Sequence, residues 1–253
     1  MTWDMTNDNE ECGMTRMMGM ALILGLLSGC SWQEDTEVVG TGAVIEQRQP
    51  LGEIDKVAAM VPATIRILAG DKPGLSIRGQ ENLLPLLSVT ERGNQLEIEV
   101  EDGYKLAPTE PLELTITLPR LRELALAGNS QGEIGHFKGD KLVLSLAGSG
   151  GIQAQRLELD SLEGNIAGSG GLDLGSGTVR TLELNIAGTG DVQGSRLESG
   201  EAEVNIAGSG DVEVRARERL NINIAGSGSI AYWGDPKVEQ RVAGSGSVTR
   251  EGS

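Results

Sequence analysis

The sequence predicts an all-β fold, a single-stranded right-handed β-helix wound into stacked coils of about 20 residues. Three observations predict it. A five-residue phrase, an aliphatic residue followed by Ala, Gly, Ser or Thr, and Gly, recurs at a nearly constant spacing. Aromatic residues are only 2% of the chain while glycines number 37, so Leu, Ile and Val must form the core. Apolar and polar residues alternate with period two around the phrase, as in strands with one buried face.

The repeated phrase sets the length of a coil. Successive central glycines from Gly128 to Gly244 are 20 residues apart four times and 18 apart twice. Such a fixed period is typical of a solenoid, in which each unit buries its apolar side against its neighbours. A looser copy starts at Leu126, and the full copies start at Leu146, Ile166, Ile186, Ile206, Ile224 and Val242.

Residues 1–29 are predicted to be a lipoprotein signal peptide. An apolar run, residues 17–29, follows Arg16 and is shorter than the roughly 20 residues of a membrane-spanning helix. It ends in Leu-Ser-Gly-Cys, which resembles the bacterial lipobox, so Cys30 is expected to carry a lipid. An ordinary secretory signal with an incidental cysteine is the alternative. The acidic stretch before Met14 does not suit a signal, so we expect the true start near Met14.

Residues 30–42 are expected to form the lipidated cysteine and a polar tether. The other cysteine, Cys12, would be removed with the signal, which leaves Cys30 without a disulfide partner. Ser31 follows Cys30 where an Asp would favour retention in the inner membrane. This resemblance to the sorting rule favours the outer membrane, facing the periplasm or the cell surface.

Residues 43–125 alternate as strands do but do not repeat. The clearest segments, residues 64–68, 75–78, 95–100 and 112–118, are separated by turns rich in Gly, Pro and Asn. We interpret them as irregular, wider coils of the same solenoid, with a separate domain as the alternative. The regular repeats then occupy residues 126–253.

One regular coil is expected to contain three short strands and three corners. In residues 181–200, Leu182, Leu184 and Ile186 alternate with polar residues, a glycine-rich turn follows, and shorter segments begin at Val192 and Leu197. Coils should be about 4.8 Å apart, and parallel crossovers are right-handed in about 98% of cases. Like residues then stack, including an outer ladder of asparagines that can hydrogen-bond along the stack, at positions Asn165, Asn185, Asn205 and Asn223.

The order of motifs resembles the putative auto-transporter adhesin, head GIN domain family of bacteria over residues 51–233. The resemblance depends on Gly-Gln-Glu-Asn-Leu-Leu from Gly79, Gly-Asn-Gln-Leu from Gly93, Pro-Arg-Leu from Pro119, and the repeated Asn-Ile-Ala-Gly-Ser-Gly. It implies a right-handed β-helix in an exported, often lipid-anchored protein with an adhesin role. It brings no catalytic residues.

Histidine and cysteine, the residues that catalytic triads and most zinc sites require, are scarce. His136 is the single histidine and is expected at an exposed turn, so catalytic triads and multi-histidine metal sites are not expected. Asp191 and Asp211 occupy equivalent positions and are weak candidates for calcium, although solvent-relieved repulsion is the favoured interpretation. No cofactor is expected.

The C-terminal coils contain the one aromatic pair, Tyr232 and Trp233. It is expected either to cap the stack or to form a small binding platform, with capping favoured. Asp211, Arg215 and Arg217 are expected nearby, so an enzymatic site, if there were one, should lie here.

The sequence therefore predicts a lipid-anchored β-helix of the cell envelope that acts as an adhesin or interaction surface without catalysis. A net charge of −16 argues against nucleic acid as a partner. The expected partners are the membrane, through the lipid, and a glycan or surface protein. The alternatives are a polysaccharide-processing enzyme and a structural envelope protein without a ligand.

Overall fold

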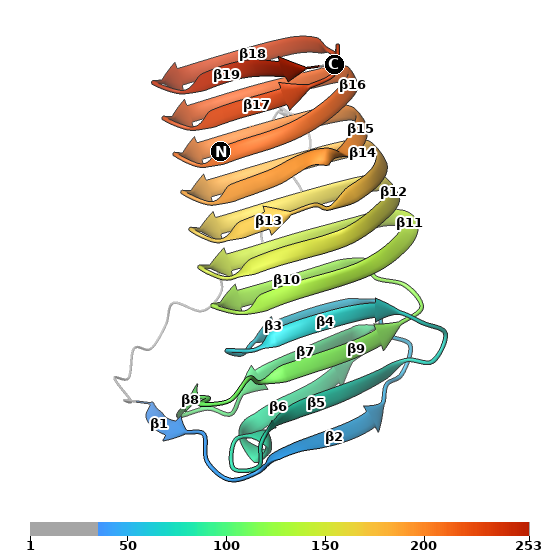
Figure 1. The fold of residues 1–253 in the computed structure, drawn as a ribbon, viewed down its shortest axis with the longest axis vertical. Coiled ribbons are helices and arrows are strands. Elements are labelled where there is room, and N and C mark those ends of the chain that lie inside the picture. Colours follow the sequence, from blue (N-terminus) through green and yellow to red (C-terminus); the bar gives the residue numbers. More distant parts are fainter. Residues whose placement is uncertain (1–34, 253) are drawn as a thin grey trace, which may run out of the picture. The chain divides into compact units, whose positions relative to one another are not determined.

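The computed structural model describes residues 35–252, and the predicted β-solenoid is confirmed (Figure 1). Seventeen strands join in one hydrogen-bonded sheet that winds around an aliphatic core. Within these residues the one helical element is a 3-10 turn, η1 (Leu84–Leu86). The described part of the chain has no helix long and apolar enough to cross a membrane.

The regular coils are long strands bent at corners. They are β11 (Gln131–Gly148), β12 (Gly151–Gly168), β14 (Ser176–Gly188) with the short β13 (Gly171–Asp173), β15 (Asp191–Gly208) and β16 (Asp211–Gly226). Between β11 and β12 the pairing lapses at residues 135/155 and 140/160, which divides each coil into three faces. The third of these, residues 161–168 of β12 and their register partners, is called the asparagine face below.

The stacking register is the predicted one. Leu146, Ile166 and Ile186 are direct partners in successive parallel strands, and the column continues through Ile206, Ile224 and Val242. The shortening from 20 to 18 residues arises between β15 and β16, where the register shifts twice at corners. Parallel neighbours in register place like side chains above one another, so the buried column remains aliphatic throughout.

The N-terminal half differs from a simple succession of wider coils. β3 (Lys56–Met60) and β4 (Thr64–Ala69) lie directly against the first regular coil, in parallel with β10 (Glu123–Gly128) and β11. The next coil outward is formed by β7 (Gln95–Val100) and β9 (Glu113–Leu118), again in parallel. Spatial order and chain order therefore disagree here, because the chain moves away from the stack and then returns.

The outer N-terminal strands are antiparallel. β5 (Gly74–Gln80) pairs with β9 and with β2 (Val44–Pro50), and β6 (Leu87–Arg92) forms a hairpin with β7. β1 (Thr36–Val39) and β8 (Tyr104–Ala107), by contrast, pair in parallel and form a separate two-stranded sheet. Period-two alternation predicted strands here, but it does not encode their direction, since both kinds of sheet share that period.

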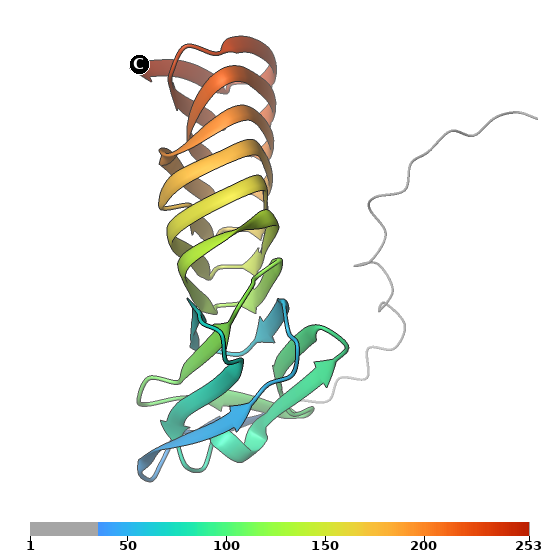
Figure 2. The same ribbon diagram turned by 90° about the vertical axis from the view of Figure 1, so that its right-hand side faces the viewer.

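The C-terminal coils are formed by β17 (Ser229–Trp233), β18 (Lys237–Gly244) and β19 (Ser247–Gly252). β18 pairs with β16, and β19 pairs with β17, all in parallel. Most residues of β18 are exposed, and 41% of the surface of Val242 is accessible although its column is buried in the coils below. The antiparallel strands and these coils lie at opposite ends of the elongated body (Figure 2).

Candidate interaction surface

The asparagine face presents the predicted ladder. Asn185 Nδ2 donates to Asn165 Oδ1 at 3.1 Å, Asn205 to Asn185 at 3.0 Å, and Asn223 to Asn205 at 2.8 Å. Arg241 continues the chain with a 3.5 Å contact from Nη1 to Asn223 Oδ1. Asn185 and Asn205 each use both the donor and the acceptor of the amide between coils, so the ladder stabilises the stack and also forms a polar stripe along it.

A column of acidic residues runs beside this ladder. Glu163, Glu183 and Glu203 are register partners in successive coils. Each accepts a hydrogen bond from the asparagine two positions later, at 3.0 to 3.3 Å. The Asn165 amide, helped by Lys141, lowers the pKa of Glu163. These bonds offset the mutual repulsion of the stacked carboxylates, and the face is negatively charged in its middle coils β12, β14 and β15, where its outward residues include acids and no bases.

The glycine corners border the same face. Gly188 has φ of 129°, a region that side chains avoid, and a Cβ there would collide with the carbonyl oxygen of Gly168. The following hydroxyl residues stack as predicted, with 3.1 Å between Thr189 Oγ1 and Ser169 Oγ. The corners therefore serve the tight winding of the coils.

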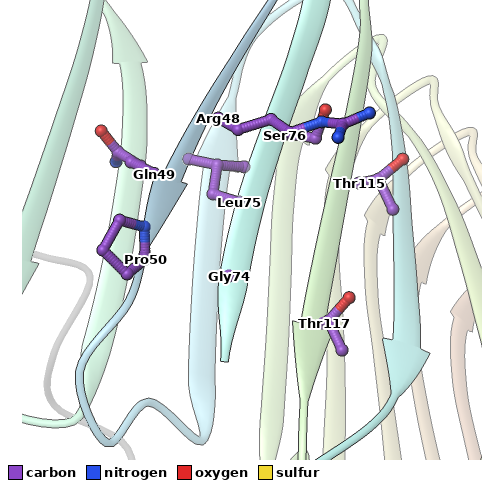
Figure 3. A pocket seen from close by; sticks show the side chains of 8 residues that line it. All are labelled: Arg48, Gln49, Pro50, Gly74, Leu75, Ser76, Thr115 and Thr117. Carbon is purple, nitrogen blue, oxygen red and sulfur yellow. The ribbon is translucent and has the colours of Figure 1, made fainter. Parts of the chain in front are cut away.

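A shallow groove lies on the antiparallel end of the solenoid, and sequence reasoning did not find it (Figure 3). Its volume is about 390 Å³, and its walls come from β2, β5 and β9. Arg48, Ser76 and Thr115 are neighbours across these strands. Glu46 accepts from Arg48 Nε at 2.8 Å and from Ser76 Oγ at 2.6 Å, and these contacts lower the pKa of Glu46. No pattern in the sequence indicates this groove, because its residues become neighbours only through antiparallel pairing.

The predicted aromatic pair is divided between two faces of β17. Tyr232 packs against the core, as a cap would, because it follows the inward Ile230 by two positions. Trp233 follows directly and therefore points to the other side of the strand, near Gly252. The two rings do not form one flat platform, and ligand binding by Trp233 stays a prediction.

Asp191 and Asp211 are linked through the backbone. Asp191 Oδ1 accepts a hydrogen bond of 2.9 Å from the Asp211 N–H of the next coil. No group of three His, Cys, Asp or Glu side chains in residues 35–252 is arranged to hold a metal ion. Calcium requires about six to eight oxygen ligands, so the two aspartates alone do not make a site.

The basic residues near the C-terminal coils have separate structural contacts. Arg215 Nε donates to the Ser195 carbonyl at 3.0 Å, and Arg217 forms a 3.0 Å ion pair with Glu198. Arg215 is the register partner of Trp233. The hydrogen bond fixes Arg215 against the preceding coil, whereas the Arg217 side chain is 69% exposed.

His136 lies within strand β11, and the expected turn position is wrong. Its side chain is 46% exposed, and its Nε2 lies 3.2 Å from Glu158 Oε1. Glu158 also accepts from Lys138 at 2.6 Å and from Arg156 at 2.9 Å. These contacts, that of Lys138 foremost, lower the pKa of Glu158 to about 2. The cluster is a surface ion-pair network on one edge of the coil.

Cys30, the predicted lipidation site, lies outside the residues that the structure describes. Its modification therefore stays a prediction based on the signal-like sequence before it.

The fold is shared with several solved bacterial proteins. A putative adhesin from Bacteroides fragilis is 25% identical and has a TM-score of 0.80, with 85% of this chain and 100% of that chain covered. A putative lipid binding protein from Parabacteroides distasonis is 26% identical with a TM-score of 0.72 and the same coverage. A putative adhesin from Parabacteroides merdae is 22% identical with a TM-score of 0.67, and the match covers 85% of this chain and 99% of that chain. This likeness shows the fold alone. Comparison with curated proteins finds no match.

The family profile described as putative auto-transporter adhesin, head GIN domain matches residues 54–236. This segment contains the β3–β4 coil, the return through β9 and the glycine corners up to Gly234. The chain therefore belongs to the putative auto-transporter adhesin, head GIN domain family.

Proposed function

We propose that this protein is a lipid-anchored protein of the bacterial cell envelope that uses its solenoid as an adhesive surface and catalyses no reaction. The adhesin description of the family and of the solved neighbours supports a location at the envelope or surface. The lipobox-like sequence before Cys30 supports a lipid as the means of attachment. The outer membrane is the proposed site, since Ser31 follows the cysteine.

The observation that carries the proposal is the continuous asparagine face. In the middle coils β12, β14 and β15, its outward columns of Ala, Asn and Glu repeat in register, which gives an acidic strip with evenly spaced carboxylate and amide oxygens. Evenly spaced groups suit repetitive ligands such as surface glycans or extended protein segments. Side chains of this face hydrogen-bond to their neighbours in the stack. These contacts do not place an acid and a base on opposite sides of a cleft.

The anchor is tested by cell fractionation. The Cys30→Ser variant should leave the membrane fraction or accumulate unprocessed, because acylation requires the thiol. Cys12→Ser is the matched control and should behave as the unaltered protein, since that residue precedes the proposed cleavage site. Normal processing and membrane retention of Cys30→Ser would show that the anchor is wrong.

The surface is tested with the protein lacking residues 1–30, which keeps every described strand. It should bind one or more members of a glycan array or an envelope protein fraction, and Glu183→Arg combined with Glu203→Arg should weaken that binding by changing the charge of the asparagine face. Lys138→Glu, on another edge of the coil, is the control. Phospholipid vesicles belong in the same screen, because one solved neighbour is described as a putative lipid binding protein.

Catalysis is tested by incubating the same protein with pectin, alginate, chitin and peptidoglycan, with and without calcium. The proposal expects no cleavage. Cleavage that is lost in Asp211→Asn or Arg215→Ala would establish the polysaccharide-processing alternative instead.

A further inference from the structure

The last coil that the structure describes ends in an unpaired strand edge. β18 has β16 as its parallel partner on one side, and no strand of residues 35–252 pairs with it on the other (Figure 1). An exposed edge of this kind is a template for a further strand. At the opposite end of the body, antiparallel strands cover the stack (Figure 2).

The backbone groups that remain free on β18 belong to its inward-facing residues. In the first regular coil the outward Val143 donates its N–H to the coil below, to the Arg122 carbonyl at 2.9 Å. Glu239 lies in the column that begins at Val143, so its groups also point toward the coil below. The direction of the backbone N–H and C=O groups alternates from one residue to the next along a strand. The groups of Val238, Gln240 and Val242 therefore point toward the open edge.

The sequence of this edge is complementary to itself when reversed. It reads Val-Glu-Gln-Arg-Val over residues 238–242. In an antiparallel pair with Gln240 opposite the same residue of a second copy, each Val238 faces a Val242 and each Glu239 faces an Arg241. The inward residues then form the hydrogen-bonded pairs. The charged residues fall at the non-hydrogen-bonded pairs, where opposite side chains approach most closely.

Neighbouring registers are less favourable. Centring the pair on Glu239 or on Arg241 places like charges opposite each other, which destabilises a sheet. Centring it on Val238 places Pro236 opposite Gln240, and proline has no N–H to donate. The register with Gln240 on the two-fold axis therefore combines the longest pairing with two attractive ion pairs.

Gln240 also interrupts the buried column in a way that fits a two-fold axis. Its register partners in the preceding coils are Ile222, Val204 and Leu184, all buried. A single polar residue at a core position is a known device for fixing the register of an association. Two glutamine amides facing each other across the axis can satisfy one another, while the half-exposed Val242 becomes covered.

We propose that two copies of the protein join end to end through β18, in an isologous antiparallel pair with Gln240 on the two-fold axis. Such a contact is closed, because the same edge is used by both copies. It doubles the length of the solenoid and places the two N-terminal ends, where β1 begins at Thr36, at opposite extremes. If the tether is lipid-anchored, as proposed above, copies on facing surfaces would meet at their C-terminal coils and hold those surfaces together.

The register is tested by disulfide trapping. Residues 35–253 form one compact unit, and the protein lacking residues 1–30 contains neither of the two cysteines. Gln240→Cys brings two thiols together across the axis, at the Cα separation of about 5.5 Å that a disulfide favours. It should form a covalent dimer under mild oxidation, whereas Glu183→Cys, in the same face of a middle coil, should not. Failure of Gln240→Cys to link, or equal linking of both variants, would overturn the register.

The charge pairs are tested by analytical ultracentrifugation. The unaltered protein should show a concentration-dependent monomer–dimer equilibrium without larger species. Glu239→Arg alone and Arg241→Glu alone should each weaken the dimer at least about tenfold, because every reversal acts twice across the axis. The two single variants should pair with each other when mixed, and the double reversal should dimerise with itself. A strictly monomeric protein, open-ended polymers, or single variants that dimerise normally would overturn the proposal.

The adhesive consequence is tested separately. Beads that carry the protein through its N-terminal end should cluster, beads with either single reversal should not, and a mixture of the two reversed kinds should cluster. If the protein dimerises in solution but the beads do not cluster, the proposed adhesive role is wrong and the proposed dimer is still supported. Retention of clustering by a Cys30→Ser protein attached chemically would show that the contact does not depend on the proposed lipid anchor.

Discussion

The glycine corners give the sharpest test of how the coils are held. Gly188→Ala places a side chain at φ of 129° and drives its Cβ into the carbonyl oxygen of Gly168. Backbone strain in such a region costs about 1–3 kcal/mol, and overpacking against a rigid backbone costs about 1–3 kcal/mol more. We therefore expect the free energy of unfolding to fall by roughly 4 kcal/mol.

Substitutions at two further glycines separate the cost of backbone strain from the cost of steric collision. Gly93 has φ of 65°, and a Cβ added there would have nothing within 4 Å, so Gly93→Ala adds strain without collision. It should cost about 1 kcal/mol or less, because the substitution also restricts the unfolded chain. At Gly139 the new Cβ would lie 4.0 Å from Leu159 Cδ2 at an ordinary φ, so Gly139→Ala should be neutral or slightly stabilising.

The assay is urea unfolding of the protein lacking residues 1–30, followed by circular dichroism and by tryptophan fluorescence. Coincident transitions justify a single free energy, which is necessary because repeat proteins can lose coils in steps. The reasoning is refuted if Gly188→Ala falls within about 1 kcal/mol of Gly139→Ala, since strain and collision would then contribute little.

Three other perturbations follow from particular contacts. Asn185→Asp removes the donor to Asn165 Oδ1 and adds a charge beside the acidic column. It should lower the free energy of unfolding by about 1–3 kcal/mol at neutral pH. The loss should be smaller at acidic pH, where the new carboxyl group is protonated. The fully buried Ser130 hydroxyl donates to the Val61 carbonyl at 2.7 Å, so Ser130→Ala should cost about 1–3 kcal/mol in chemical unfolding. The Glu158 carboxyl should titrate by NMR with a pKa of about 2. This group stabilises the fold above its ordinary pKa of 4.5 and loses that contribution as the pH falls through about 2, and Lys138→Met should raise its pKa.

The regular half of the molecule could be predicted because the repeat carries its own register. A period of 20 residues places Ile166 above Leu146 and Asn185 above Asn165 without any further information, and the structure has both pairs. The glycines at the corners could likewise be predicted, because a coil this narrow needs backbone angles that other residues resist. Even the looser first copy has a reason, since Ser130 meets the Val61 turn of an irregular coil and donates a hydrogen bond to it.

The asparagine ladder was predicted, but the other candidate features were predicted less well, because they depend on which face of a strand each side chain takes. Consecutive positions in a strand point to opposite sides, so Tyr232 and Trp233, adjacent in sequence, are divided between the core and the exterior. The groove around Arg48 had no signal, since its walls are brought together by strand pairing across residues 48, 76 and 115. His136 was misplaced at a turn because β11 continues as one strand through this corner, although its pairing with β12 lapses at residue 135.

The sequence by itself determined the solenoid, the length of its coils, its stacked ladders and its family. The tertiary structure decided the order and direction of the N-terminal strands, in which β3 and β4 reach the first regular coil although residues 70–122 intervene in the chain. It also decided that β18 ends the stack with an open edge within the described residues. The physical reason is that repeats encode contacts between equivalent residues at a fixed separation, whereas pairing between unlike strands depends on long-range packing that no local pattern records.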